Sequence, residues 1–132
     1  MKDLTGIINE GNYINKFNDL INIYNKINNK QINNETEIDK EGNKYIGEFK
    51  NGLRNGKGIL YYNSKDYYKR NRYEGEWKNG LREGKGILYW NSANKYEGDF
   101  KKDEIDGKGI LYWKNGDKYE GDFIKGKEVE KE

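Results

Sequence analysis

The chain has 132 residues, of which 33% are hydrophobic and 36% charged, and its 25 basic and 23 acidic residues give a net charge of +2. Cysteine and histidine are absent, which excludes thiol catalysis, disulfide bonds, Cys/His zinc sites and histidine-based triads. The balanced charge does not indicate a nucleic-acid-binding protein. An aromatic content of 14% argues against a disordered chain. Without a transmembrane run or a signal-peptide stretch, we expect a cytoplasmic protein with no cofactor.

Residues 1–39 form a first segment whose composition differs from the rest of the chain. Between positions 13 and 29, apolar residues recur at the intervals of an amphipathic helix, although the stretch INIYNKI also alternates as a strand does. These apolar residues are Ile14, Phe17, Leu20, Ile21, Tyr24 and Ile27. We interpret the predicted helix as a cap on the array that follows. Docking of a partner or of a second copy of the chain is the alternative.

Four copies of the phrase Tyr-x-Gly-acid-aromatic come next, and their first residues are 28, 23 and 23 positions apart. Residues at i, i+2 and i+4 lie on one side of a strand, because strand side chains alternate between faces. Each phrase therefore predicts a strand. The repeated residues are Tyr45, Gly47 and Phe49, then Tyr73, Gly75 and Trp77, then Tyr96, Gly98 and Phe100, and finally Tyr119, Gly121 and Phe123.

The first three phrases each lead to a Gly-Lys-Gly-Ile-Leu-Tyr-aromatic line, beginning at Gly56, Gly84 and Gly107. Six-residue stretches such as NGLRNG join phrase and line, so each unit predicts a β-hairpin of about 23 residues. A lone hairpin is marginal in water, and we therefore expect the hairpins to stack into one antiparallel sheet. The strand glycines are expected to leave room for a stacked row of aromatic rings.

This pattern, Tyr-x-Gly-x-Phe/Trp followed by Gly-x-Gly, resembles the MORN (membrane occupation and recognition nexus) repeat. Three repeats match between Tyr45 and Lys118, and a half repeat runs from Tyr119 to about Gly126. A degenerate half repeat is expected before them, because KEGNKY at 40–45 parallels KNGDKY at 114–119. The resemblance implies a mainly β fold, an elongated single-layer antiparallel sheet of stacked MORN hairpins. Here a short N-terminal α-helical segment would precede the sheet.

The domain organisation follows from the repeat: the array occupies residues 40–126 and a charged tail occupies 127–132. Two departures from the repeat are visible. Asp103 stands where the other joints have glycine, and five additional residues expand the joint between Tyr62 and Tyr73.

The Gly-Lys-Gly element is not a phosphate-binding loop, because three residues rather than four separate Gly80 from Gly84 and no Ser or Thr follows Lys85. The acidic run KKDEIDG at 101–107 fits a calcium loop poorly and predicts an exposed turn. One carboxylate per repeat is better explained by an ion-pair ladder than by acid–base catalysis. The ladder would join Glu48, Glu76, Asp99 and Asp122 to Lys57, Lys85 and Lys108.

The resemblance implies a non-enzymatic scaffold or protein-interaction module, and too few residues lie outside the repeats for a catalytic domain. Aromatic residues of the second line fall on both faces of the sheet. One set is therefore expected to line a groove that holds a partner segment, such as a helix, or the chain's own helix. These groove candidates are Tyr61, Tyr62, Tyr89, Trp90, Tyr112 and Trp113.

The expanded joint SKDYYKRNRY suggests an alternative function, peripheral membrane association through anionic phospholipid headgroups. The cytoplasmic protein would then lie peripherally at a membrane or at a cytoskeletal structure. Its lipid or phosphate candidates are Lys65, Tyr67, Tyr68, Lys69, Arg70 and Arg72. A long solvated hairpin tip is the simpler interpretation, and no nucleic acid is expected. Self-association through the open edge of the strand at 118–124 is a further alternative.

Overall fold

The computed structural model describes residues 16–20, 23 and 34–128 of the chain. The chain divides into two compact units, Met1–Ile32 and Asn33–Glu132. In the first unit, residues 16–20 are helical, as is Ile23. The rest of the helix predicted at 13–29 lies outside the described residues.

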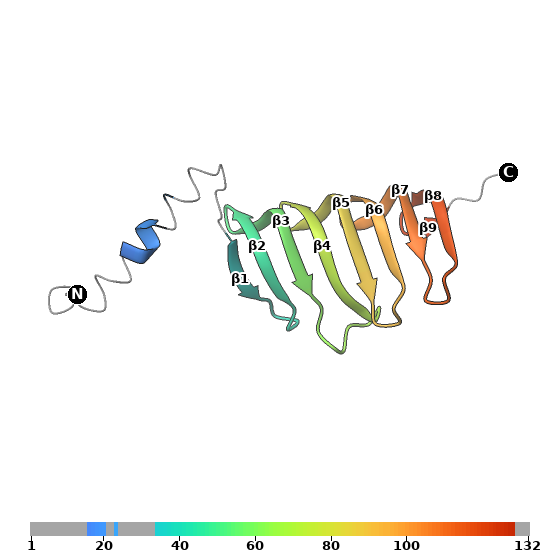
Figure 1. Cartoon of the computed structure of the whole chain (residues 1–132), viewed down its shortest axis with the longest axis horizontal. Helices are drawn as coiled ribbons and strands as arrows, with labels where there is room; N and C mark the ends of the chain where they lie inside the picture. Colours follow the sequence, from blue (N-terminus) through green and yellow to red (C-terminus); the bar gives the residue numbers. More distant parts are fainter. Residues whose placement is uncertain (1–15, 21–22, 24–33, 129–132) are drawn as a thin grey trace. The chain divides into compact units, whose positions relative to one another are not determined.

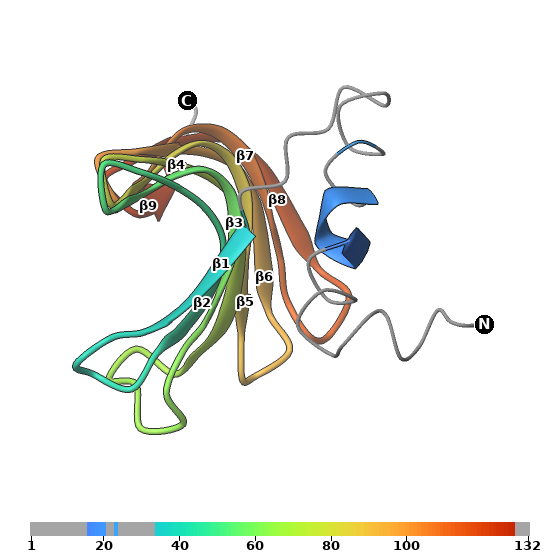
Figure 2. The same ribbon diagram turned by 90° about the vertical axis from the view of Figure 1, so that its left-hand side faces the viewer.

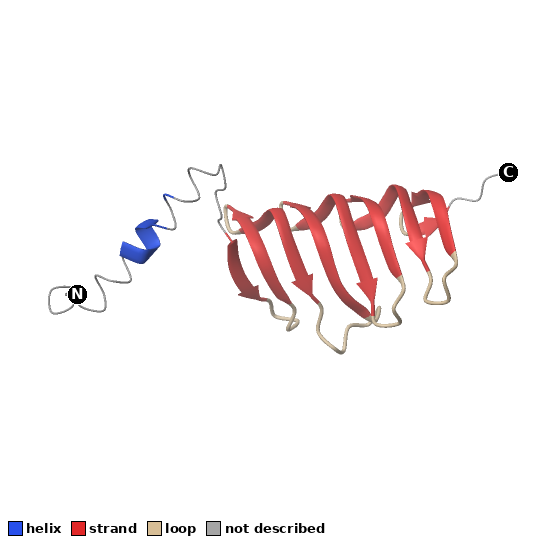
Figure 3. Ribbon diagram, viewed as in Figure 1, coloured by secondary structure: helices blue, strands red, loops and turns tan. Residues whose placement is uncertain are grey.

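The second unit is one antiparallel sheet in which nine strands pair in chain order (Figure 1). The strands are β1 (Asn34–Ile38), β2 (Lys44–Lys50), β3 (Leu53–Tyr61), β4 (Arg70–Lys78), β5 (Leu81–Trp90), β6 (Lys95–Lys101), β7 (Glu104–Tyr112), β8 (Lys118–Ile124) and β9 (Lys127–Glu128). Short loops join them, and no helix interrupts the described part of this unit (Figure 3). The predicted mainly β, single-layer architecture is confirmed.

Strand β1 lies inside the segment that the sequence assigned to the N-terminal helix and its linker. It pairs with β2 as β3 pairs with β4: Glu37 lies opposite Tyr45, where Leu60 of β3 lies opposite Tyr73 of β4. Its sequence, NETEI, lacks the Gly-Lys-Gly-Ile-Leu signature, and the repeat pattern indicates it only through the turn KEGNKY at 40–45, which parallels KNGDKY at 114–119. Because Glu37 is held 3.0 Å from Arg54, a charged residue ends the apolar row at this edge, as protected sheet edges commonly do.

The hairpin joints are shorter than the sequence pattern predicts. Strand β3 begins at Leu53, directly after the dipeptide Asn51–Gly52, whose φ angles are 54° and 79°. Two positive φ angles are the mark of a two-residue type I′ turn, which Asn-Gly favours. The prediction that six residues such as NGLRNG form the joint is therefore wrong, because the Asn-Gly dipeptide closes the hairpin alone. The equivalent turns are Asn79–Gly80, Lys102–Asp103 and Lys125–Gly126.

A bulge in each of the three full hairpins bends the sheet. In the first hairpin a single residue of β2, Glu48, faces three residues of β3, 55–57. Within these three, Gly56 has a φ of 101°, which L side chains rarely adopt. The second and third hairpins shift register at the same place. Seen along the array, the strands consequently curve around one face of the sheet (Figure 2).

The concave side of this curve carries the aromatic row. Arg54, which lies past the bend, places its guanidinium 5.0 Å from the ring centroid of Tyr45, which lies before the bend. Tyr45, Tyr73 and Tyr96 are 0% exposed, and a single-layer sheet can bury side chains to this degree only where it curls over them. The remaining buried apolar residues are Leu60, Trp77, Leu88, Phe100 and Phe123.

Alkaline pH is expected to destabilise the array through these tyrosines. Burial raises the pKa of Tyr45 and of Tyr96 to about 12, and it also raises the pKa of Tyr73. Between about pH 10 and pH 12 the unfolded chain loses these protons before the folded chain does. The free energy of unfolding should therefore fall as pH rises, by roughly 1.4 kcal/mol per tyrosine and pH unit.

Urea denaturation at successive pH values measures this fall. Tyr96→Phe removes one of the ionising groups and should make the dependence shallower than in the parent chain. A dependence that is equally steep in the variant would show that other groups control alkaline unfolding.

Candidate functional site

The acidic residue of each of the first three repeat phrases binds the backbone of the bulge opposite it. The carboxylate of Glu48 accepts a hydrogen bond of 2.6 Å from the N–H of Lys57. The bulge interrupts the regular hydrogen bonding between the two strands, so the N–H of Lys57 would otherwise lack an acceptor. The equivalent bonds join Glu76 to Lys85 at 2.7 Å and Asp99 to Lys108 at 3.0 Å. The carboxylates therefore have a structural role that the ion-pair prediction missed.

The tyrosine that opens each phrase completes the bulge from the concave side. The hydroxyl of Tyr45 donates a hydrogen bond of 2.8 Å to the carbonyl of Glu48, and the three later phrases make the same bond. A Cβ atom on Gly58 would overlap the ring of Tyr45. The Gly-Lys-Gly element is therefore architecture: its first glycine forms the bulge, and its second makes room for the ring.

Two pairs of the predicted ion-pair ladder join neighbouring hairpins on the convex face. Lys85 pairs with Asp99, and Lys108 lies 2.7 Å from Asp122. The third predicted lysine, Lys57, makes no ion pair with a residue that the structure describes. The side chains of Lys85 and Lys108 are 75% and 79% exposed. Ion pairs that are this exposed contribute little to stability.

The six aromatic groove candidates do not meet in one groove. Tyr61, Tyr89 and Tyr112 lie on the convex face, beside basic residues of the adjacent strands. Tyr62 and Trp90 instead pack against the concave core. The sixth candidate, Trp113, is half-buried and follows the end of β7.

The basic residues of the expanded joint also diverge. Arg70 donates two side-chain hydrogen bonds of 2.9 and 2.7 Å to Asp66 and lies 4.2 Å from the ring of Tyr62. These bonds hold the pKa of Asp66 below its usual value. Arg72 binds Glu74 at 2.6 Å on the other face of the sheet. Four exposed candidates remain at the loop, and they are Lys65, Tyr67, Tyr68 and Lys69.

Two arginines cover the concave core at equivalent positions of the first two hairpins. The guanidinium of Arg54 lies 5.0 Å from the Tyr45 ring and 5.3 Å from the Trp77 ring. That of Arg82 lies 5.8 Å from the Tyr73 ring and 5.2 Å from the Phe100 ring. Ile105 occupies the equivalent position in the third hairpin, where it pairs with Phe100 as Arg82 pairs with Trp77.

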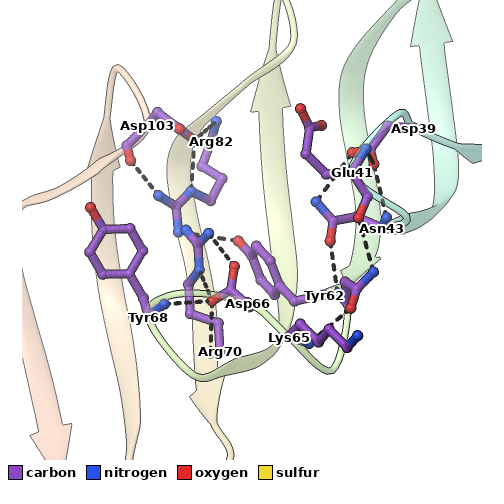
Figure 4. A network of polar contacts seen from close by, with 11 residues as sticks. Asp39, Glu41, Asn43, Tyr62, Lys65, Asp66, Tyr68, Arg70, Arg82 and Asp103 are labelled. Carbon is purple, nitrogen blue, oxygen red and sulfur yellow. Dashed lines mark hydrogen bonds and ion pairs between the residues drawn. The ribbon is translucent and has the colours of Figure 1, made fainter.

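Arg82 is fixed by a network that crosses to the next hairpin (Figure 4). It is 7% exposed, its Nε lies 2.7 Å from the carboxylate of Asp103, and it also donates to the Asp103 backbone carbonyl. A third bond, of 3.4 Å, reaches the hydroxyl of Tyr62. Asp103 has a φ of 72° in a turn position where the other joints have glycine. The ion pair with Arg82 offsets the backbone strain that this positive φ imposes on an aspartate.

A groove of about 580 Å³ opens on the concave face of the third hairpin. Its lining residues are Trp90, Tyr96, Ile105, Leu111, Phe123, Gly126 and Lys127. Leu111 is only half-buried here, whereas the equivalent Leu60 and Leu88 are 5% and 3% exposed. The isoleucine at 105 covers less of the core than an arginine does. The signal was present in the sequence as Leu-Arg at 53–54 and 81–82, but Glu-Ile at 104–105.

Stacked hairpins with the same bulge, turn and ring contacts define a β-repeat protein. The MORN repeat model matches residues 45–67, 73–95 and 96–118, which is just over half of the chain. The chain belongs to the MORN repeat family, whose arrays are in general non-enzymatic scaffolds or interaction modules. Among the curated proteins, no sequence matches the chain.

Two features of other protein classes are absent from the described residues. None of their helices is long and apolar enough to cross a membrane. They also contain no group of three or more acidic residues placed to hold a metal ion.

Proposed function

We propose that the array is a non-enzymatic scaffold that binds an apolar segment of a partner protein in the concave groove of the third hairpin. The observation that carries this proposal is that arginine side chains cover the concave core in the first two hairpins but not in the third. Arg54 and Arg82 close the core of the first two hairpins, whereas Ile105 leaves Leu111 half-buried beside Trp90. Apolar surface that a protein leaves accessible in this way commonly marks a binding site.

The lining of the groove indicates the chemistry of the bound segment. Apolar and aromatic side chains form most of its wall, and Lys127 is the one charged side chain among its described lining residues. A leucine, isoleucine or aromatic anchor of a partner would replace the cover that arginine supplies elsewhere, and an acidic residue next to the anchor would suit Lys127. Such anchors bury the largest apolar area per side chain and dominate binding energies at interfaces.

Ile105→Arg tests the proposal, because it introduces the residue that closes the first two hairpins. Peptides selected from a random display library against the parent chain should bind Ile105→Arg at least about tenfold more weakly, since the anchor and the new arginine compete for one space. Ile110→Arg is the matched control, since Ile110 lies on the other face of the same strand. It adds the same charge and should leave peptide binding unchanged.

Selected peptides that bind both variants equally well would contradict this site. Sedimentation with anionic lipid vesicles separates the membrane alternative, which rests on the four exposed residues of the expanded joint. Vesicle binding that Lys65→Ala/Lys69→Ala abolishes, together with failure to select any peptide, would favour that alternative instead.

A further inference from the structure

The convex face carries two neighbouring rows of side chains that run across the strands. In the first row, tyrosines of β3, β5 and β7 alternate with basic residues of β4 and β6. The central members of this row are Tyr61, Arg72, Tyr89, Lys95 and Tyr112. In the second row isoleucines alternate with glutamates, namely Ile59, Glu74, Ile87, Glu97, Ile110 and Glu120. All these side chains are half-buried or exposed.

A shallow groove of about 760 Å³ runs beside the second row. Its two lysines, Lys85 and Lys108, are neutralised by ion pairs with aspartates. Its two glutamates, Glu97 and Glu120, are exposed and have no ion pair within the described part of the chain. Among the described lining residues, the charge that remains unpaired is therefore negative, and it is complementary to a basic ligand.

Tyrosines lie on the same face of the sheet as this groove, in the neighbouring first row. Tyr89 and Tyr112 stand two residues beyond Ile87 and Ile110 on the same strands, and therefore on the same face. The Arg72 guanidinium lies 3.8 Å from the Tyr89 centroid. In the next hairpin, the basic residue of the outgoing strand lies 5.0 Å from the Tyr112 centroid. Rows of aromatic rings of this kind are a surface on which proline-rich segments dock.

The period of the rows selects the conformation of the ligand. Equivalent residues of successive hairpins are two strands apart, which corresponds to about 9.6 Å. A polyproline II helix repeats every three residues, or about 9.3 Å. The closest α-helical repeat of seven residues is about 10.5 Å, and same-face side chains of an extended strand recur about every 6.6 Å. Polyproline II fits best, and its mismatch stays below about 1 Å over three tyrosines.

We infer that the convex face binds a proline-rich segment in the polyproline II conformation that carries a basic residue at every third position. The prolines lie on the tyrosine row, and the basic side chains reach Glu97 and Glu120. The segment runs across the strands, along the array. This site is separate from the concave groove, since the sheet lies between them.

Fluorescence anisotropy of a labelled peptide of repeated Pro-Lys-Ala triplets, titrated with the full chain, tests the inference. Glu97→Gln/Glu120→Gln should weaken binding about tenfold, since it removes both unpaired carboxylates. Glu35→Gln/Glu104→Gln is the matched control, because it makes the same charge change at two exposed glutamates outside the groove. It should change the affinity less than twofold.

A shuffled peptide, in which no residue type recurs every third position, should bind at least about tenfold more weakly than the regular peptide. Equal binding of the two peptides, equal losses in the two glutamate double variants, or no binding below about 1 mM would each overturn the inference. Binding that persists in Ile105→Arg separates this site from the concave groove, and its loss in that variant would also overturn the inference.

Discussion

Gly86→Ala is expected to lower the free energy of unfolding by about 3 kcal/mol or more. A Cβ atom at this position would overlap the ring and hydroxyl of Tyr73, which is 0% exposed. The ring cannot move aside without losing its 2.8 Å hydrogen bond to the carbonyl of Glu76 and its edge-to-face contacts with Trp77 and Phe100. The substitution therefore disrupts the bulge and the core of the second hairpin together. Urea denaturation followed by tryptophan fluorescence measures the change.

Gly116→Ala is the matched control for this prediction. Gly116 has a φ of 99° in an exposed turn, and a Cβ atom there would meet nothing within 4 Å. It tests backbone strain without overlap, and roughly 1 kcal/mol of destabilisation is expected. If the two variants lost the same amount of stability, the second glycine of the Gly-Lys-Gly element would not be required to make room for the tyrosine.

Asp103→Gly should destabilise the protein by about 2 kcal/mol, although glycine suits the turn better. The φ of 72° at Asp103 favours glycine. Removal of the carboxylate, however, leaves the guanidinium of Arg82, 7% exposed, without its counter-charge. The side chain of Asp103 is 48% exposed, so the expected loss is smaller than for a fully buried pair.

The sign of this effect should reverse when Arg82 is replaced by isoleucine, the residue at the equivalent position of the third hairpin. In the Arg82→Ile background no guanidinium needs a counter-charge, and Asp103→Gly should then stabilise the protein by roughly 1 kcal/mol through relief of backbone strain. A double-mutant cycle by urea denaturation gives both values. Stabilisation by Asp103→Gly in both backgrounds would mean that the ion pair contributes nothing.

The fold could be predicted because its determinants are local and repeated. Alternation in Tyr-x-Gly-acid-aromatic identifies each strand, and recurrence of the phrase identifies the stacking. Strand β1 was indicated only by the turn KEGNKY at 40–45, which parallels KNGDKY at 114–119, because the sequence NETEI lacks the apolar residues of the repeat signature. The short turns could have been predicted from the Asn-Gly dipeptides at 51–52 and 79–80, which are a strong hairpin signal.

The candidate site was harder to predict, because side chains that are neighbours in sequence lie on opposite faces of a sheet. Tyr89 and Trp90 are adjacent in the chain, yet one belongs to the convex row and the other to the concave core. The sequence marks the bulge only by the first glycine of each Gly-Lys-Gly element, and a strand glycine also occurs where it makes room for a ring. The bulge becomes recognisable once the carboxylate of Glu48 is seen to bind the N–H of Lys57. Arg70 and Arg72 are two residues apart, so regular alternation would place them on one face of the sheet. They lie on opposite faces because the pairing of β4 with β5 shifts register between them.

Methyl NMR of the array during titration with a selected peptide tests the central proposal most directly, because β7 carries an internal comparison. Leu111 lines the concave groove, while Ile110, its neighbour in the chain, lies on the convex face. Binding in the concave groove of the third hairpin predicts that the methyl signals of Ile105 and Leu111 shift and that those of Ile87 and Ile110 do not. Shifts confined to Ile87 and Ile110 would contradict it.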